Sequence, residues 1–352
     1  MTAAFDPRAE DDGDSNTGRI PANYQDPPAD PSKMGWGDAT FNIAQRSTIE
    51  RGLQENLKIA VPASFAVGAS SVHEKIEAAI RKQFKFDEGF SFYVTDRMVY
   101  GTDLMMSQLI GNCVGASHAM LCASRYAYEI LAEGDPEEPL GTGMLGCPWI
   151  PYSYGVGRLV GDMLGPGDGS YCGAQIEGTQ KYGFIPCFTE GLDRYGGELP
   201  QSSAEANRLL GRSRAEIEKW MAKAKPFDLL EAPRCESADD AKLLVCDRRI
   251  PLQICSGWGF RYWKRDANGV ELYRPSGSWD HSMQVCAVFR IKGQWYVAIR
   301  NQWGNEAHLG SPEQGIPRGS FVITIEDFAK WVRSAECIGI GQIQGLPVKP
   351  IA

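Results

Sequence analysis

The sequence predicts an α+β fold with two lobes and a long N-terminal extension, from three observations. Helix-like patterns dominate the chain before Ile250, strand-like patterns dominate after it, and residues 1 to about 40 have too few apolar side chains to fold alone. Helices first and strands later is the order typical of the α+β class. We divide the chain into an acidic, proline-rich N-terminal arm (1–70), a mainly helical lobe (71–235) and a β-rich lobe (236–352).

The N-terminal arm begins MTAAFDPRAEDDGDSNTGRIPANYQDPPADP. It is acidic and rich in proline, the opposite of a signal peptide. No apolar run in the chain approaches the roughly 18 residues that cross a bilayer. We therefore expect no signal peptide and no transmembrane segment, and a cytoplasmic or particle-associated protein. The lead-in before the site is either a pro-region or an arm that docks on a protein partner.

Charge and cysteine usage exclude several classes of partner. The formal net charge is −8, and Lys and Arg form no long stripe, which disfavours nucleic acid as a partner. Nothing indicates a membrane partner. The ten cysteines are scattered without a C-x-x-C pair, so we expect no zinc or other metal site and no cofactor. Most of these cysteines are expected to be reduced, buried and small core residues.

The predicted helices precede residue 250. The first covers 70–84, where Ser71 and Glu74 have the spacing of a capping box. A second begins at Cys113 and ends near Gly134. Further helices are expected over 174–184, 213–225 and 237–246.

Strand-like segments and one long loop complete the pattern. Residues 90–100 alternate like a strand, and residues 135–169, rich in Gly, Pro and aromatics, are expected to be a loop. Four later strands are expected over 251–260, 282–291, 294–303 and 319–325. A helix is expected over 326–334.

Cys113 is the candidate nucleophile. Asn112 is a good N-cap residue, which would put Cys113 in the first turn of its helix. The partial positive charge of a helix N-terminus favours a thiolate there. On position alone, a small buried residue packed at a helix start is the better interpretation of Cys113.

A nucleophilic cysteine needs a base, and the chain has four histidines. His118 shares the helix of Cys113, but five steps of about 100° turn it away, which predicts a core histidine. His73 is expected to be solvated, and His308 follows a loop without a strong context. His281 opens a buried strand, where it can face a cleft from a rigid element.

Asn301 is the candidate partner of that histidine. A turn near Gly293 sends the chain back, so the return strand brings Asn301 toward the end where His281 lies. Its carbonyl oxygen would accept the imidazole N–H and hold the ring. Trp303 would shield that hydrogen bond from water. Taken singly, Asn301 could equally be a turn residue, and Trp303 could equally be an aromatic residue of the core.

Three segments, QLIGNCVGAS, WDHSM and RNQWG, resemble the glutamine-plus-cysteine, histidine and Asn-x-Trp-Gly segments of the papain-like cysteine peptidases. The resemblance implies a papain-like two-lobed fold, with the cysteine on the helical lobe and the histidine and asparagine on the β-rich lobe. It implies Cys113 as nucleophile, His281 as base and then acid, Asn301 as the group that orients His281, and Gln108 as an oxyanion donor.

The segment GDGSYCGAQIEGTQKYGF resembles the family's glycine-containing substrate strip with its following helix. This implies that Gly169 and Ser170 lie beside a bound peptide, and Asp280, next to His281, is placed in the same substrate-binding group. The chain departs from the family at Val114, where an aromatic residue is usual. The separation of Gln108 from Cys113 is also one residue shorter than usual, so the chain resembles a divergent member, as from a bacterium or phage.

The expected function is a cysteine peptidase that hydrolyses peptide bonds in a peptide or protein substrate. A thiol amidase or acyltransferase would use the same triad. A third interpretation is a non-enzymatic papain-like scaffold in a larger assembly such as a virion, which the long acidic arm and the departures around Cys113 favour.

Overall fold

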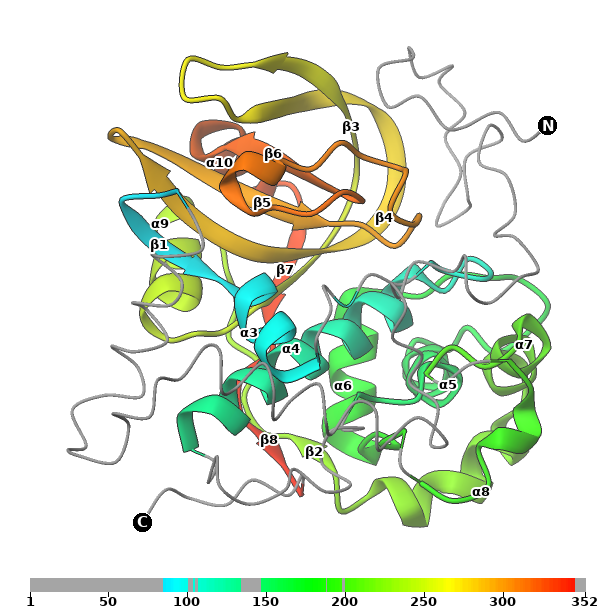
Figure 1. Cartoon of the computed structure of the whole chain (residues 1–352). Coiled ribbons are helices and arrows are strands. Elements are labelled where there is room, and N and C mark those ends of the chain that lie inside the picture. Colours follow the sequence, from blue (N-terminus) through cyan, green and yellow to red (C-terminus); the bar gives the residue numbers. More distant parts are fainter. Residues whose placement is uncertain are drawn as a thin grey trace.

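The structure is a computed structural model that describes residues 85–100, 104, 107–133, 147–187, 189–197 and 200–345. The N-terminal arm and the helix expected over 70–84 lie outside the described residues. Helices gather on one side of the molecule and a curved sheet on the other, as Figure 1 shows. The expected α+β class is confirmed.

The helical side is built on a long, almost fully buried helix, α4. The helices packed there are α4 (Cys113–Glu133), α5 (Ile150–Val160), α6 (Cys172–Tyr182), α7 (Ala204–Arg212) and α8 (Arg214–Ala224). Helices α4, α6 and α8 confirm three predicted helices. The expectation of a continuous loop over 135–169 is wrong, because α5 forms there. Its glycines do not break it, since they let it pack closely against its neighbours.

The β-rich side is a six-stranded sheet within the described residues, with the path β5-β6-β4-β3-β7 and β1 paired to β4. Its strands are β1 (Glu88–Ser91), β3 (Leu252–Arg265), β4 (Glu271–Ile291), β5 (Gln294–Arg300), β6 (Ser320–Thr324) and β7 (Glu336–Gly339). Because β4 pairs with both β5 and β6, and these pair with each other, the three strands close on themselves. The predicted strands and the helix α10 (Ile325–Val332) are confirmed.

The strand expected over 90–100 is wrong for most of its length, because the helix α3 (Phe92–Tyr100) forms there. Almost every described side chain of α3 is buried, so the alternation in the sequence did not mark an exposed face. Asp96 of α3 forms a fully buried ion pair with Arg300 at the end of β5, at 2.6 Å. The helix therefore supports the chain directly before Asn301.

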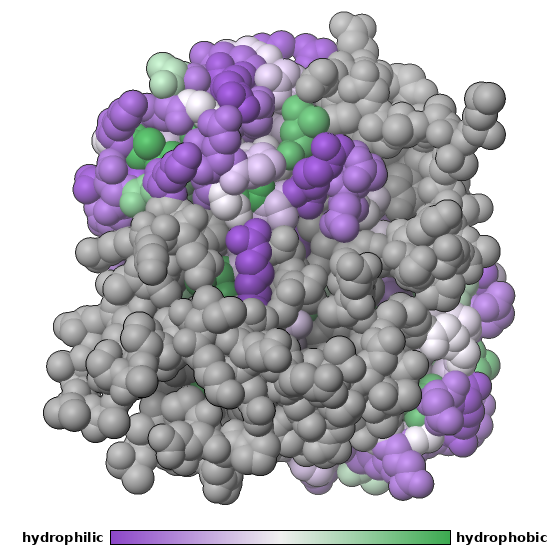
Figure 2. Space-filling model, in the orientation of Figure 1, coloured by the Kyte–Doolittle hydropathy of each residue, from purple (hydrophilic) through white to green (hydrophobic). Residues whose placement is uncertain are grey.

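Short elements complete the molecule. They are β2 (Asp228–Leu229), which pairs with β8 (Ile343–Gln344), α9 (Ala238–Lys242) with the π-helical turn η6 (Leu243–Asp247), and the 3₁₀ turns η5 (Asp193–Tyr195) and η7 (Pro312–Gln314). The helix expected over 237–246 is confirmed by α9 and η6. Among the described residues, no helix combines the length and hydropathy of a membrane span. The coloured part of the face in Figure 2 is mostly hydrophilic over the β-rich side.

Candidate active site

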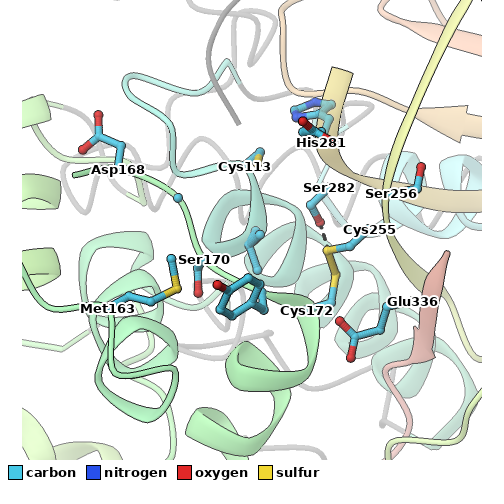
Figure 3. Close-up of a pocket in the computed structure, with 14 residues that line it drawn as sticks. Cys113, Met163, Asp168, Ser170, Cys172, Cys255, Ser256, His281, Ser282 and Glu336 are labelled. Carbon is cyan, nitrogen blue, oxygen red and sulfur yellow. Dashed lines mark hydrogen bonds between the residues drawn. A yellow bond between two sulfur atoms is a disulfide. The ribbon is translucent and has the colours of Figure 1, made fainter. Parts of the chain in front are cut away.

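A cavity of about 450 Å³ lies between the helical and β-rich sides of the molecule (Figure 3). Both sides contribute to its wall. The lining residues are Cys113, Val114, Met163, Asp168, Gly169, Ser170, Tyr171 and Cys172 from the helical side, and Cys255, Ser256, Asp280, His281, Ser282 and Glu336 from the β-rich side. Cys113, His281, Gly169, Ser170 and Asp280, which sequence reasoning assigned to one site, therefore share one cavity.

Cys113 is the first residue of α4 and is 2% exposed. The carbonyl of Asn112 accepts the N–H of Ala116 at 3.0 Å, as at a helix start. The Asn112 side chain does not cap the helix as expected. Its Nδ2 donates to Oδ1 of Asn207 at 2.8 Å, and its Oδ1 bonds to nothing among the described residues. The amides of the first helical turn are therefore left uncapped beside Cys113.

Two opposing effects act on the Cys113 thiol. Burial raises its pKa to about 11, while the backbone N–H groups of Ser282, Val114 and Cys113 itself lower it. Burial is the larger effect, so the thiol is neutral at pH 7 in this geometry. The Ser282 amide belongs to the residue after His281, and so the sulfur lies at the part of β4 that carries the histidine.

His281 lies in the middle of β4, not at the start of a strand as expected, because pairing with β3 continues back to Glu271. It is 3% exposed. Its Nε2 lies 2.7 Å from Oδ1 of Asn301, the residue after β5. The indole of Trp303 stacks on the imidazole with centroids 4.8 Å apart. Burial lowers the pKa of His281 to about 4, against the opposing hydrogen bond from Asn301. The ring is therefore neutral above about pH 4.

The orientation of the Asn301 amide fixes which nitrogen of His281 carries the proton. The backbone N–H of Gln302 donates to Oδ1 of Asn301 at 2.7 Å, so this atom must be the oxygen. His281 must then donate from Nε2 to the same oxygen. In the neutral ring, Nδ1 consequently holds the free lone pair, which is the requirement for a base.

A second histidine, His308, supports the same asparagine, and sequence reasoning missed it. Nδ2 of Asn301 donates to Nε2 of His308 at 2.7 Å. His308 is 1% exposed and packs against Tyr273 and Phe321. Burial lowers its pKa to about 3, so the ring is neutral and can accept. The contact depends on how the loop after β5 folds back on Asn301.

A buried polar network holds α4 against the strands that carry His281. The hydroxyl groups of Ser117 on α4 and Ser282 on β4 lie 2.7 Å apart. Gln253 of β3 donates from Nε2 to the Val114 carbonyl at 2.9 Å and to the Ser117 hydroxyl at 2.7 Å. Because these groups are fully buried, breaking one bond would leave an unsatisfied polar atom. The network therefore fixes the start of α4 relative to His281.

Gln108 and His118 lie away from the cavity wall. Gln108 is fully buried, its Nε2 donates to the Ile110 carbonyl at 3.1 Å, and it is not among the described residues that line the cavity. Its backbone N–H donates to the Gln302 carbonyl at 2.7 Å, which joins the loop before Cys113 to the Asn301 segment. His118 is a buried core histidine, as expected, with Nε2 2.9 Å from the Thr179 hydroxyl.

A disulfide joins Cys172 at the start of α6 to Cys255 on β3, with a Cα separation of 6.1 Å. Both residues line the cavity, so the bridge crosses from one side of the cleft to the other (Figure 3). These two cysteines depart from the expectation of reduced thiols. Sequence reasoning missed the pair because the cysteines lie 83 residues apart and meet only in the folded chain.

The charged groups in the cavity wall are acidic. Asp168, Asp280 and Glu336 line it, and none of the described lining residues is Lys or Arg. The carboxylate of Glu336 lies against Gly173 in the first turn of α6, where a helix N-terminus favours an anion. Within the described residues, no group of His, Cys, Asp and Glu could hold a metal ion.

Comparison with known proteins finds likeness only among solved structures. No family model and no curated protein matches the chain. The cysteine protease xylellain from Xylella fastidiosa is 13% identical, with a TM-score of 0.45, and the match covers 74% of this chain and 87% of xylellain. Procathepsin B S9 from Trypanosoma congolense is 11% identical, with a TM-score of 0.41 over 74% of this chain and 80% of its own. The ragweed pollen cysteine protease Amb a 11 in its proform is 12% identical, with a TM-score of 0.38. The match covers 75% of this chain and 68% of the ragweed protein.

Proposed function

We propose that the protein is a papain-like cysteine peptidase in which Cys113, His281 and Asn301 form the catalytic triad. The observation that carries the proposal is the fixed tautomer of His281. The Gln302 N–H orients Asn301, Asn301 orients His281, and the free lone pair is left on Nδ1 of a ring that shares the cleft with Cys113. A histidine held only for packing would not need this arrangement.

In the proposed reaction, His281 first acts as a base. Nδ1 takes the Cys113 proton as the sulfur bonds to the substrate carbonyl carbon, and the carbonyl π electrons move to oxygen. The tetrahedral adduct then expels the amine, which leaves with the proton from His281. Water, deprotonated by the same nitrogen, hydrolyses the thioester and frees the Cys113 thiol. Because Cys113 and His281 are both neutral in this geometry, thiol deprotonation and attack are coupled.

The developing oxyanion needs hydrogen-bond donors. The backbone N–H of Cys113 is one candidate, because the Asn112 side chain leaves the first turn of α4 uncapped. Gln108 is the second candidate from the sequence. To serve, its Nε2 would have to exchange the Ile110 carbonyl for the substrate oxygen. Loss of one such donor typically costs roughly 10²–10³ in rate.

Gly169, Ser170 and Asp280 are proposed to contact the substrate. All three line the cavity, and Gly169 has a φ of +100°, a backbone conformation that favours glycine, so the strip carries no side chain at that point. A peptide could therefore approach the backbone of this strip closely. Trp303 is proposed to shield the hydrogen bond between His281 and Asn301, since it stacks on the imidazole.

The proposal is tested by comparing Cys113→Ala with Cys246→Ala. We expect Cys113→Ala to lower peptide hydrolysis on the order of 10⁴-fold or more, since it removes the nucleophile. The control changes a half-buried thiol outside the cleft and should retain activity. Circular dichroism would show whether both variants fold. Undiminished hydrolysis by folded Cys113→Ala would refute the proposal.

The scaffold interpretation is the second candidate, favoured by the low exposure of Cys113 and its raised pKa. A cysteine-directed electrophile separates the two. A peptidase should be labelled at Cys113 much faster than at its other free thiols, while a scaffold should be labelled slowly throughout. Trapping the acyl-enzyme with amines instead of water would identify the amidase or acyltransferase alternative.

A further inference from the structure

Two pairs of cysteines outside the disulfide, all four of them free thiols in the structure, face each other across short antiparallel contacts. In the first, Pro148 and Pro186 form an isolated antiparallel bridge, so Cys147 and Cys187 lie opposite each other one residue away. The Cys187 N–H donates to the Cys147 carbonyl at 3.0 Å, and the Trp149 N–H donates on the other side of the bridge at 2.6 Å. The register of this pair is therefore fixed by two backbone hydrogen bonds.

The second pair repeats this geometry elsewhere in the fold. Arg234 and Ile338 form an isolated antiparallel bridge, which puts Cys235 opposite Cys337 of β7. The Cys235 N–H donates to the Cys337 carbonyl at 3.0 Å, and the Gly339 N–H donates on the other side at 2.7 Å. Both cysteine pairs thus occupy the same position relative to their bridges.

This position suits a disulfide. Opposite residues in a hydrogen-bonded antiparallel pair have Cα atoms about 5.5 Å apart and side chains on the same face. Disulfides span Cα separations of about 4.4–6.8 Å. All four cysteines are at most 4% exposed. Burial, and then the facing thiol, raises the pKa of both Cys147 and Cys337 well above its ordinary value, which indicates that each thiol lies beside its partner.

We infer that the protein carries two more disulfides, Cys147–Cys187 and Cys235–Cys337, in addition to Cys172–Cys255. Each bridge forms by thiol–disulfide exchange with a small-molecule disulfide such as oxidised glutathione. One thiolate attacks that disulfide and releases one small thiol. The second thiolate then attacks the mixed disulfide and releases the other. Each protein pair loses two protons and two electrons, and the oxidant leaves as two thiols.

The three bridges would leave Cys113 in the cleft as a free thiol. Cys147–Cys187 fastens the entry of α5 to the segment after α6, and Cys235–Cys337 fastens the residue next to Glu336 of the cavity wall. Of the ten cysteines, six would be paired, and Cys113, Cys122, Cys246 and Cys286 would remain as thiols. Such a framework forms in oxidising surroundings, unlike the cytoplasm expected from the N-terminal sequence. The inference does not depend on the proposed peptidase function.

Disulfide mapping of the full chain tests the inference. The protein is refolded with oxidised and reduced glutathione, blocked with an alkylating reagent in denaturant without reductant, digested and analysed by mass spectrometry. We expect peptides linked through Cys147–Cys187 and Cys235–Cys337, and alkylation confined to the other four cysteines. The inference would be overturned by alkylation of Cys147, Cys187, Cys235 and Cys337, whether or not Cys172–Cys255 is linked.

Paired substitutions give a second measurement. Two double variants are compared, Cys147→Ser with Cys187→Ser and Cys235→Ser with Cys337→Ser. Each should lower the denaturation midpoint of the oxidised protein more than that of the reduced protein. The matched control, Cys246→Ser with Cys286→Ser, alters two free thiols whose S–H groups donate to the Val288 carbonyl and to Oε1 of Gln284, and it should shift both forms equally. The same shift for all three double variants would contradict the additional bridges. If a variant fails to fold, the mapping of the unaltered chain still decides.

Discussion

At the scale of single residues, Asn301 is held from three directions. Its Oδ1 accepts from His281 and from the backbone of Gln302, and its Nδ2 donates to His308. These contacts leave the amide a single orientation, and that orientation determines the tautomer of His281. Each partner arrives from a different point of the chain, so no local motif contains the whole set. His308 had no recognisable context in the sequence for this reason.

His308 is expected to be a positioning residue for Asn301. His308→Leu removes the acceptor for Nδ2 and should lower kcat roughly tenfold, within the range that supporting hydrogen bonds contribute at metal sites. His308→Gln offers a carbonyl oxygen and should retain more of the rate. Kinetics should place the loss in kcat more than in KM.

The control for this prediction is spectroscopic. In the unaltered protein, nitrogen-15 chemical shifts of His281 should show the proton on Nε2, and His308→Leu should mix the two tautomers. A variant that is merely less stable would keep the Nε2 tautomer in its folded fraction. Equal kcat in His308→Leu and the unaltered protein would remove the positioning role.

At the scale of elements, α5 and α6 pack closely enough for backbone to meet backbone. A Cβ atom on Gly178 of α6 would lie 2.9 Å from the carbonyl carbon and oxygen of Val156 on α5. A Cβ atom on Gly157 of α5 would lie 2.6 Å from the side-chain Oε1 of Gln175 on α6. These contacts hold α5 and α6 against each other on the helical side of the molecule.

Gly178→Ala is expected to destabilise the protein by about 1–3 kcal/mol, because two backbone segments must move apart. The helix preference of Ala over Gly, about 1 kcal/mol, offsets only part of this cost. Gly167→Ala is the matched control, since a Cβ there meets nothing within 4 Å. It should change the free energy of unfolding by less than about 0.5 kcal/mol. Urea denaturation measures both, and equal midpoints would contradict the close packing.

The sequence predicted the elements whose pattern reflects one buried face or a clear terminus. Helices α4, α6 and α8 and the later strands belong to this group. It failed for α3 and α5, where almost every described side chain is buried and periodicity carries no information. In α5, glycines that serve close packing also resembled loop residues.

Some residues of the candidate site could also be predicted from the sequence, and others could not. Cys113 and Asn301 were identifiable because each stands at an element end with a defined chemical type, and His281 because it precedes a strongly apolar strand segment, although it lies in the middle of β4. The Cys172–Cys255 bridge and the direction of the Asn112 side chain were not, because they depend on which distant segments meet. The His308 contact was missed because it depends on how the loop after β5 folds back on Asn301. Register and side-chain rotamers across 80 or more residues are outside the reach of local patterns.

At the scale of the whole molecule, three buried histidines should make stability depend on pH. Burial lowers the pKa of His118 to about 4, His281 to about 4 and His308 to about 3. The unfolded chain therefore binds more protons between about pH 6.5 and pH 4. Their contribution is fully present above about pH 6.5 and is lost as the pH falls through that window.

The expected result is a lower urea midpoint at pH 4.5 than at pH 7. His118→Gln, which removes one titrating ring outside the cleft, should show a smaller difference between the two pH values than the unaltered protein. Midpoints that do not change with pH in the unaltered protein would mean that the rings are not buried as neutral groups.

The acidic wall of the cavity should favour cationic substrates. Asp168, Asp280 and Glu336 face the space in which a peptide would lie, without a described basic residue among them. We expect lysine- and arginine-containing peptides to have higher kcat/KM than matched glutamate-containing peptides, with a difference that shrinks at high salt. Glu336→Gln should narrow the difference. Equal hydrolysis of both peptide classes at low salt would contradict this.

The bridge between Cys172 and Cys255 also limits how a substrate can enter. It ties the two walls of the cavity together, with Cα atoms 6.1 Å apart, and Cys113 lines the same cavity. Hinge opening, in which two rigid bodies swing apart to admit a ligand, would have to stretch this bond. The width of the cavity is therefore constrained while the bond is oxidised. Under the proposed peptidase function, we expect extended or unfolded segments to be better substrates than compactly folded proteins.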